Sequence, residues 1–441
     1  LKSRSNPDHM VMLGECGTAG ALLLFVFLIG ALGAIETPAW QAIVPALVPA
    51  AALPSAIATN SIGVNISRVL GPALTGVIIV ALGLAAPFWL DAVSNLGVIA
   101  VILWWRTAPR PAGALPPERL GGAIRAGLRY TRNNRALRAT LARAVGFFLF
   151  ASAYWALLPL LARTQLHGGP TLYGVLLGAI GAGAVGGAVV LPRLKSRSNP
   201  DHMVMLGECG TAGALLLFAV AANAAVAVLA CLLAGLSWIV VLATLNVSAQ
   251  VALPEWVRGR GLAAYVAAFF GTMSLGSLAW GALAERRGLP LTHALAAGGA
   301  LVALVLTRRW RLRSGPQADL TPSMHWPQPV LARPLPDEAG PAMVTVEYTV
   351  APGDRAEFFA ALAYVAHERR RDGAYDWGIF EDAAHPGHLV EVFFSDSWLE
   401  HLRAHQRVTR ADQSAEHRLR KFAHGEPRIT HYVAARAPSA P

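Results

Sequence analysis

The chain has 441 residues, of which 54% are hydrophobic and only 14% are charged. Soluble domains carry about 25% charged residues, so this composition argues against a soluble globular protein and indicates a polytopic membrane protein. The formal net charge of +11 does not point to nucleic acid, because the arginines lie in short loops between apolar segments, as in the cytoplasmic loops of membrane proteins.

The N-terminal segment is an internal copy. Residues 1–25 repeat residues 194–218 without one change, and the chain starts on Leu1 rather than on a methionine. An old repeat keeps its pattern and loses its identity, so this copy indicates a recent duplication or a cloning or assembly join. We therefore interpret residues 1–25 as an artefact that stands in place of a missing natural N-terminus.

Apolar segments of about 20 residues predict nine membrane spans. They lie near residues 17–45, 55–82, 87–105, 144–162, 171–192, 203–222, 224–248, 262–283 and 291–307. The loop 106–143 holds nine arginines and one acid, Glu118, and three further basic loops alternate with it. These loops, and the tail that follows residue 313, are therefore predicted to be cytoplasmic.

The second predicted span carries a polar motif within an apolar helix. Asn65 and Arg68 lie three residues apart and share a helix face. A buried arginine costs about 2.5–3.5 kcal/mol in a bilayer, so Arg68 is predicted to face a cavity or a partner, with snorkelling to the surface as the alternative. Small and helix-breaking residues favour close helix packing around them: Gly63, Gly71, Pro72 and Gly76.

The pattern Asn-xx-Arg-xx-Gly-Pro-xxx-Gly at residues 65–76 resembles the antiporter motif of the major facilitator superfamily. The segment PAWQAIVPALV at residues 38–48 is similar to the end of the fourth helix in the branch of the enterobactin exporter and transmembrane secretion effectors. The resemblance covers residues 26 to about 313 and implies a fold of twelve helices, of which the first three are missing. Loop 106–143 then joins two helical halves, 26–105 and 144–313.

Polar groups inside the spans are candidates for proton coupling, because they are costly in a bilayer. Glu36 is mid-span and is predicted to line a cavity. Asp91 lies near the outer end of its span, where a purely interfacial position is the alternative. Together with Arg68, these two acids are predicted to carry protonation and coupling, and Asn60 and Asn65 are predicted to be polar cavity groups.

Three further residues inside the spans are interpreted as structural. Glu208 lies near the start of its span and is duplicated as Glu15, which favours a structural role. Tyr154 and Trp155 are mid-helix aromatic residues, which are more often packing groups than substrate-stacking groups.

The composition changes after residue 313. Residues 314–341 are rich in proline and are predicted to be an extended linker. Residues 342–436 then alternate strand and helix patterns in the order β-α-β-β-α-β with a split second helix, which is typical of a small α+β ferredoxin-like domain. Its composition indicates a soluble module, and it resembles the dimeric barrels of the antibiotic-biosynthesis-monooxygenase type, so dimerisation through it is expected.

His401 and His405 lie four residues apart in the split second helix, a spacing that permits metal binding. No third ligand has a fixed place in the sequence, so we interpret the pair as part of a solvated helix face and predict no metal and no cofactor. The three cysteines imply no disulfide framework, and no phosphate-binding loop is present that would indicate ATP-driven transport.

The sequence therefore predicts an all-α polytopic membrane domain of the major facilitator type, followed by a small α+β domain. The predicted function is proton-coupled export of a small molecule, such as a siderophore, drug or metabolite, by alternating access across the bacterial inner membrane. Its partners are the cargo, protons and the lipid bilayer. Two alternatives remain open: a non-transporting truncated remnant, and a membrane-tethered enzyme that acts through the C-terminal domain.

Overall fold

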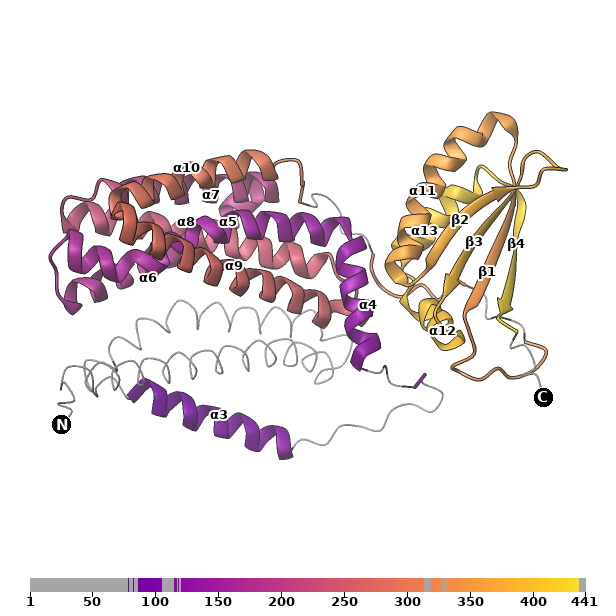
Figure 1. Cartoon of the computed structure of the whole chain (residues 1–441), viewed down its shortest axis with the longest axis horizontal. Coiled ribbons are helices and arrows are strands. Elements are labelled where there is room, and N and C mark those ends of the chain that lie inside the picture. The colour runs from indigo at the N-terminus through magenta and orange to yellow at the C-terminus, as the bar shows by residue number, and fades with distance from the viewer. Residues whose placement is uncertain are drawn as a thin grey trace, which may run out of the picture.

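The computed structural model describes residues 86–104, 115–116, 118, 120–312, 319–326, 329 and 331–435, with 78 and 82 as single residues. It shows a helical bundle and an α+β tail, with one short helix, α4, standing upright between them (Figure 1). The helices before the tail are α3 (Ala86–Trp104), α4 (Leu120–Asn133), α5 (Arg135–Leu160), α6 (Pro170–Arg197), α7 (Pro200–Ala219), α8 (Ala224–Val251), α9 (Arg258–Arg287) and α10 (Leu289–Thr307).

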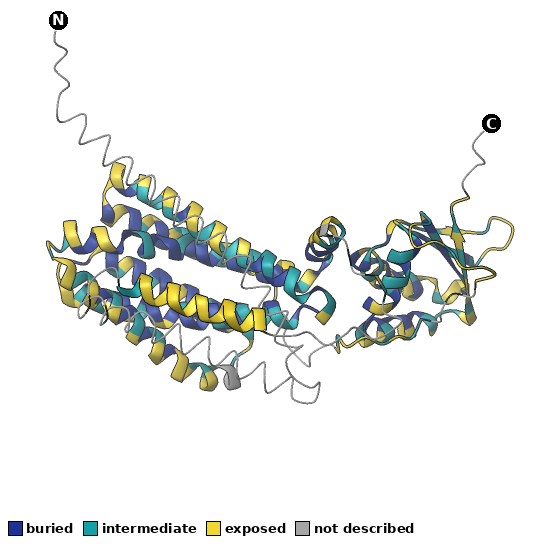
Figure 2. Ribbon diagram, turned by 90° about the horizontal axis from the view of Figure 1, so that it is seen from below, coloured by how far each residue is buried: buried dark blue, intermediate teal, exposed yellow. Residues whose placement is uncertain are grey.

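Within the described residues, seven helical segments are long and apolar enough to cross a membrane. They correspond to the last seven of the nine predicted spans, which are confirmed as helices. The first two predicted spans, 17–45 and 55–82, lie outside the described residues except for residues 78 and 82. The α3 helix, drawn below the bundle in Figure 1, has no buried residue, and residues 88–104 are exposed, as the yellow helix in Figure 2 shows.

The arginine-rich loop 106–143 is more structured than a simple connection. It contains α4 and the first turns of α5, which meet at a corner held by Asn134. The Asn134 side chain accepts a hydrogen bond from the Leu137 amide at 2.9 Å and so caps α5. Its amide group also donates to the carbonyl oxygen of Ala252 at 2.9 Å, which fixes the corner against the end of α8.

Glycines allow α6 and α8 to touch backbone to backbone. A Cβ atom at Gly183 would overlap the carbonyl oxygen of Leu232, and one at Gly235 would overlap the carbonyl oxygen of Ile180. These two glycines lie on opposite helices at one crossing point. Small residues at such crossings let membrane helices approach closely, because apolar burial between helices gives little driving force in lipid.

The tail forms a four-stranded antiparallel sheet in the order β2-β3-β1-β4, covered on one face by helices (Figure 1). Its elements are β1 (Ala342–Thr349), α11 (Arg355–Asp372), β2 (Tyr375–Glu381), β3 (His388–Ser395), α12 (Trp398–Arg407), α13 (Arg410–Arg420) and β4 (His424–Val433). This is the predicted order of strands and helices, including the split second helix. It follows from local periodicity: Val344, Val346 and Tyr348 alternate along β1 and face the same core as Phe358 and Leu362 of α11.

The tail contacts the helical part through α4, which packs on α9 on one side and on α11 on the other. Part of the predicted linker also packs rather than spanning open space. Pro322 pairs with Thr409 as an isolated β-bridge, and the Trp326 indole donates to Glu416 of α13 at 3.0 Å. The described residues 319–326 therefore belong structurally to the tail.

Candidate functional site

One face of α7 carries polar groups into the core of the bundle. Asp201, Glu208 and Thr211 follow one another at helical spacing, and Leu215 and Phe218 continue the same face. All of them except Asp201 are buried. The two buried polar side chains, Glu208 and Thr211, therefore lie within a helix that is long and apolar enough to cross a membrane.

Glu208 is the most isolated acid on this face. It is 2% exposed, and within the described part of the chain neither of its carboxyl oxygens has a hydrogen-bond partner. The hydroxyl group of Thr211, nearly one turn further along α7, is also buried without a partner there. Acids at membrane depth are rare and are functional candidates by default. The sequence favoured a structural role for Glu208. Its burial without a described hydrogen-bond partner makes it a candidate functional group instead.

Two turns before Glu208, an ion pair between the buried Arg143 and the half-buried Asp201 fixes the end of the same face. The Arg143 guanidinium of α5 donates to Asp201 at 3.0 Å and to the carbonyl oxygen of Trp310 at 3.2 Å. Asp201 accepts a further hydrogen bond from the Leu312 amide at 3.0 Å. Arg143 is therefore held by partners other than Glu208, and the pair ties α5, α7 and the segment after α10 together.

An aromatic cluster fills the bundle beyond the far end of this face. Tyr154 is fully buried, and its ring stacks with Phe218 at 6.2 Å between centroids. Trp155 packs edge-on against Trp238 at 5.4 Å, and Phe148 packs edge-on against a phenylalanine of α9 at 4.5 Å. Tyr154 lies in the hydrophobic core and Trp155 packs against it, so the packing role that the sequence predicted for both is confirmed.

Of the transport residues predicted from the sequence, Asp91 lies within the described part of the chain. Asp91 is on α3, where it is exposed and its backbone carbonyl accepts hydrogen bonds from the side chains of Ser94 and Asn95. The remaining predicted coupling, cavity and helix-packing residues lie outside the described residues: Glu36, Asn60, Gly63, Asn65, Arg68, Gly71, Pro72 and Gly76. Their roles stay predictions.

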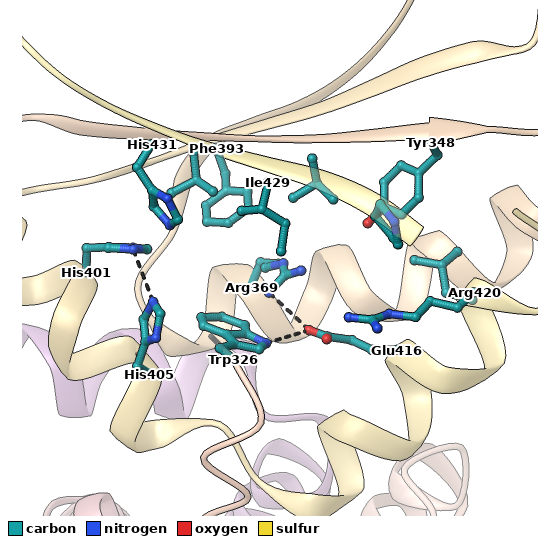
Figure 3. A pocket seen from close by; sticks show the side chains of 14 residues that line it. Trp326, Tyr348, Arg369, Phe393, His401, His405, Glu416, Arg420, Ile429 and His431 are labelled. Carbon is teal, nitrogen blue, oxygen red and sulfur yellow. Dashed lines mark hydrogen bonds and ion pairs between the residues drawn. The ribbon is translucent and has the colours of Figure 1, made fainter. Parts of the chain in front are cut away.

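The tail contains a pocket between its sheet and its helices, with about 590 Å³ of empty space that is partly open to solvent (Figure 3). Its floor is apolar, with Phe393 and Ile429 from the sheet. Arg369 of α11 lies in its wall, 4.6 Å from the centre of the Trp326 ring. Its guanidinium contacts Glu416 at 3.1 Å and Glu391 at 3.5 Å, so its charge is compensated on both sides.

Three histidines line one end of this pocket: His401 and His405 of α12 and His431 of β4. The prediction of a solvated face for the first two was wrong, because His401 is 2% exposed and His405 is 9% exposed. Burial lowers the pKa of His401 to about 3 and that of His405 to about 4, with smaller contributions from the neighbouring histidines and Arg369. Both imidazoles are therefore neutral at physiological pH.

Sequence reasoning missed the place of His431. The predicted last strand already contained it, and alternation along that strand would put Ile429 and His431 on one face. Nothing in the sequence indicated that this face meets the buried face of the split helix, because strand pairing is not encoded locally.

Comparison with known proteins concerns both parts of the chain. The sequence model of a family described as transmembrane secretion effector matches residues 9–439. No curated protein matches the chain.

Among solved structures, the fucose:proton symporter of E. coli is similar over 62% of this chain and 73% of its own, with 16% identity and a TM-score of 0.44. A bacterial homologue of the human lysosomal transporter Spinster covers 61% of this chain and 70% of its own, with 15% identity and a TM-score of 0.32. A putative antibiotic biosynthesis monooxygenase from Deinococcus radiodurans covers 22% of this chain and 97% of its own, with 20% identity and a TM-score of 0.20.

Proposed function

Because the chain belongs to the transmembrane secretion effector family, within the major facilitator superfamily, we propose that it exports a small molecule in exchange for protons. The cargo class is a siderophore, drug or metabolite, and the membrane is the bacterial inner membrane. Transport proceeds by alternating access, in which two helical halves rock around a central site. The observation that supports the proton coupling is the buried carboxyl group of Glu208, which has no hydrogen-bond partner among the described residues.

Glu208 is suited to carry a proton because its surroundings disfavour the ionised form. A buried carboxylate without a hydrogen-bond partner costs several kcal/mol, so in the described arrangement a bound proton stabilises the side chain. Release of that proton requires a second arrangement in which water or a cation reaches the carboxyl group. Alternating access provides such a state, and coupling follows because the two arrangements differ in their affinity for the proton.

The proposal also includes polar residues that the sequence predicted in the part of the membrane domain before loop 106–143. Glu36 and Asp91 are proposed as further proton-carrying groups and Arg68 as the positive charge that responds to them. Asn60 and Asn65 are proposed to line the cargo route.

We also propose that the tail is a ferredoxin-like domain on the cytoplasmic side. The support is the contact between α11 of the tail and α4, which belongs to the arginine-rich loop 106–143. A loop and a tail in contact lie on the same side of the bilayer, and basic loops of this length are cytoplasmic.

The test of coupling is transport in proteoliposomes that contain the whole chain, with ethidium and a catecholate siderophore as probe cargoes. A pH gradient should drive uptake of at least one probe by the wild type. Glu208→Gln should abolish gradient-driven uptake and keep cargo exchange without a gradient, because the amide imitates the protonated acid. The control is Glu285→Gln, at an exposed position near the end of α9, which should transport as the wild type does.

Gradient-driven uptake by Glu208→Gln at the wild-type rate would refute the role of Glu208. Absence of any probe transport by the wild type, with correctly folded protein in the vesicles, would favour the non-transporting alternative.

A further inference from the structure

The three histidines of the tail pocket come from two elements, α12 and β4, which α13 separates in the chain. His401 and His405 are four residues apart on α12, so their side chains lie one above the other on one helix face. His431 comes from β4, whose pairing places it opposite Val344 of β1. Val344 belongs to the helix-facing core of the sheet, so His431 points toward the helices as well.

The geometry of the group is close to that of a metal site. The Nε2 atoms of His401 and His405 are 3.2 Å apart. Two imidazole nitrogens that bind one tetrahedral zinc ion at about 2.0–2.1 Å lie roughly 3.3 Å from each other. Three ring nitrogens, one from each histidine, lie within 4.8 Å of one another. Figure 3 shows the three side chains at the same end of the pocket.

Simple packing of three neutral histidines leaves their polar atoms poorly satisfied. The Nδ1 atom of His401 is buried and has no hydrogen-bond partner within the described residues. The pair of Nε2 atoms shares at most one proton, and no carboxylate is paired with these rings among the described residues. An ion held between the two facing Nε2 atoms would take a lone pair from each ring, whereas His401 Nδ1 would carry the proton and keep no acceptor among the described residues.

We propose that His401, His405 and His431 bind one divalent transition-metal ion, with Zn²⁺ as the ligand of first choice. Three imidazoles are a common donor set for such ions and leave a fourth coordination position open. Because the three histidines line the pocket, a small donor molecule that enters the pocket could take that position. Binding would draw the three ring nitrogens, which lie within 4.8 Å of one another in the described arrangement, closer together.

The charges around the group are compatible with a cation. Arg369 is the nearest buried positive group of the pocket, and the carboxylates of Glu391 and Glu416 compensate it at 3.5 Å and 3.1 Å. The rings are neutral, as ligands must be, and Trp398 packs against His401 at 5.3 Å between ring centroids, which shields the group from water on that side.

The test is metal binding by the whole chain purified in detergent and stripped with a chelator. After incubation with Zn²⁺ and desalting, mass spectrometry should find about one equivalent per chain, and Co²⁺ should give the visible bands of a tetrahedral site. His401→Gln, His405→Gln and His431→Gln should each weaken zinc binding by at least about tenfold, since even loss of outer-shell partners costs 10–100-fold.

Two controls separate this site from surface binding. His417→Gln, at an exposed position of α13, should keep the bound equivalent. His385→Gln tests the rival group at the surface, where His385 contacts Asp382 at 2.9 Å. Zinc should also raise the thermal unfolding temperature of the wild-type tail and not that of His431→Gln, which reports binding to the folded state.

The proposal is overturned if the stripped wild type takes up no zinc at micromolar concentration. It is equally overturned if zinc is lost in His385→Gln and retained in His431→Gln. Transport activity enters neither result, so the outcome is independent of the proposed export function.

Discussion

Arg407 of the tail and Glu118 of the arginine-rich loop form an ion pair at 2.9 Å, although they are 289 residues apart in the sequence. The other carboxyl oxygen of Glu118 lies 2.6 Å from Arg260 of α9. Arg407 is buried, and its guanidinium also stacks on Trp256 at 4.6 Å. The one acid of the loop therefore joins the tail to the end of the helical bundle, at the point where α9 begins.

Loss of this pair should loosen the tail from the bundle. Glu118→Gln and Arg407→Gln, alone and combined, should show a coupling free energy of about 1–2 kcal/mol, since Glu118 is partly exposed and close pairs couple by about 0.5–3 kcal/mol. The measurement is hydrogen exchange of the α4 amides in the four proteins. Arg410→Gln, whose pair with Asp319 is exposed, is the control. Additive effects of the two changes would show that the pair contributes nothing to docking.

The pair of Arg143 and Asp201 should be essential for the stability of the bundle. Asp201→Ala leaves a buried guanidinium without its carboxylate, which costs about 3–5 kcal/mol and should lower the thermal unfolding temperature in detergent. The combined change Arg143→Met and Asp201→Ala should be less damaging than Asp201→Ala alone, because no charge is then left uncompensated. Equal unfolding temperatures for the single and the double variant would contradict this account.

The crossing of α6 and α8 should tolerate no added methyl group. Gly235→Ala should destabilise the protein by about 1–3 kcal/mol, because its Cβ would overlap the carbonyl oxygen of Ile180. Gly178→Ala, on α6 with no described atom within 4 Å of its Cβ position, is the matched control and should be neutral or slightly stabilising. Yield of monodisperse protein and thermal unfolding measure both. Similar losses in the two variants would refute the close approach.

The tail should lose stability as the pH rises through the neutral range. Arg371 lies among three acidic side chains: it contacts Glu368, and it contacts Asp372 at 2.8 Å and Asp412 at 3.0 Å. Burial first, and then a hydrogen bond with Asp412, raises the pKa of Glu368 from 4.5 to about 9. Between these values the folded tail holds a proton that the unfolded chain has released, so the free energy of unfolding falls as pH rises.

Glu368→Gln removes this titration. Each pH unit within the window costs the wild type up to about 1.4 kcal/mol, so the variant should match the wild type near the acid end and exceed its stability near the alkaline end. Thermal unfolding of the tail in the whole chain, followed across the pH range, measures the difference. Glu357→Gln, at an exposed position of the same helix, should leave the pH profile unchanged. A profile of Glu368→Gln that keeps the wild-type slope would assign the titration to another group.

Local patterns in the sequence were sufficient for much of the fold. Apolar length predicted the spans that became α3 and α5 to α10, since a bilayer imposes that length on any crossing helix. Alternation predicted β3 at residues 388–395, which are its observed bounds. The start of α5 was placed nine residues late, because its first turns are rich in arginine and only the cap at Asn134 marks them as helix.

The sequence by itself determined the membrane class, the described spans and the order of elements in the tail, because period and composition are properties of neighbouring residues. Only the tertiary structure decided which polar groups have partners and which do not. Glu208 looked structural until the packing of α7 left both its oxygens without a described partner. His401 and His405 looked solvated until the register of β4 brought His431 to them. Whether a side chain is buried, and which side chains meet, depends on the packing of separate segments. No local pattern predicts that packing.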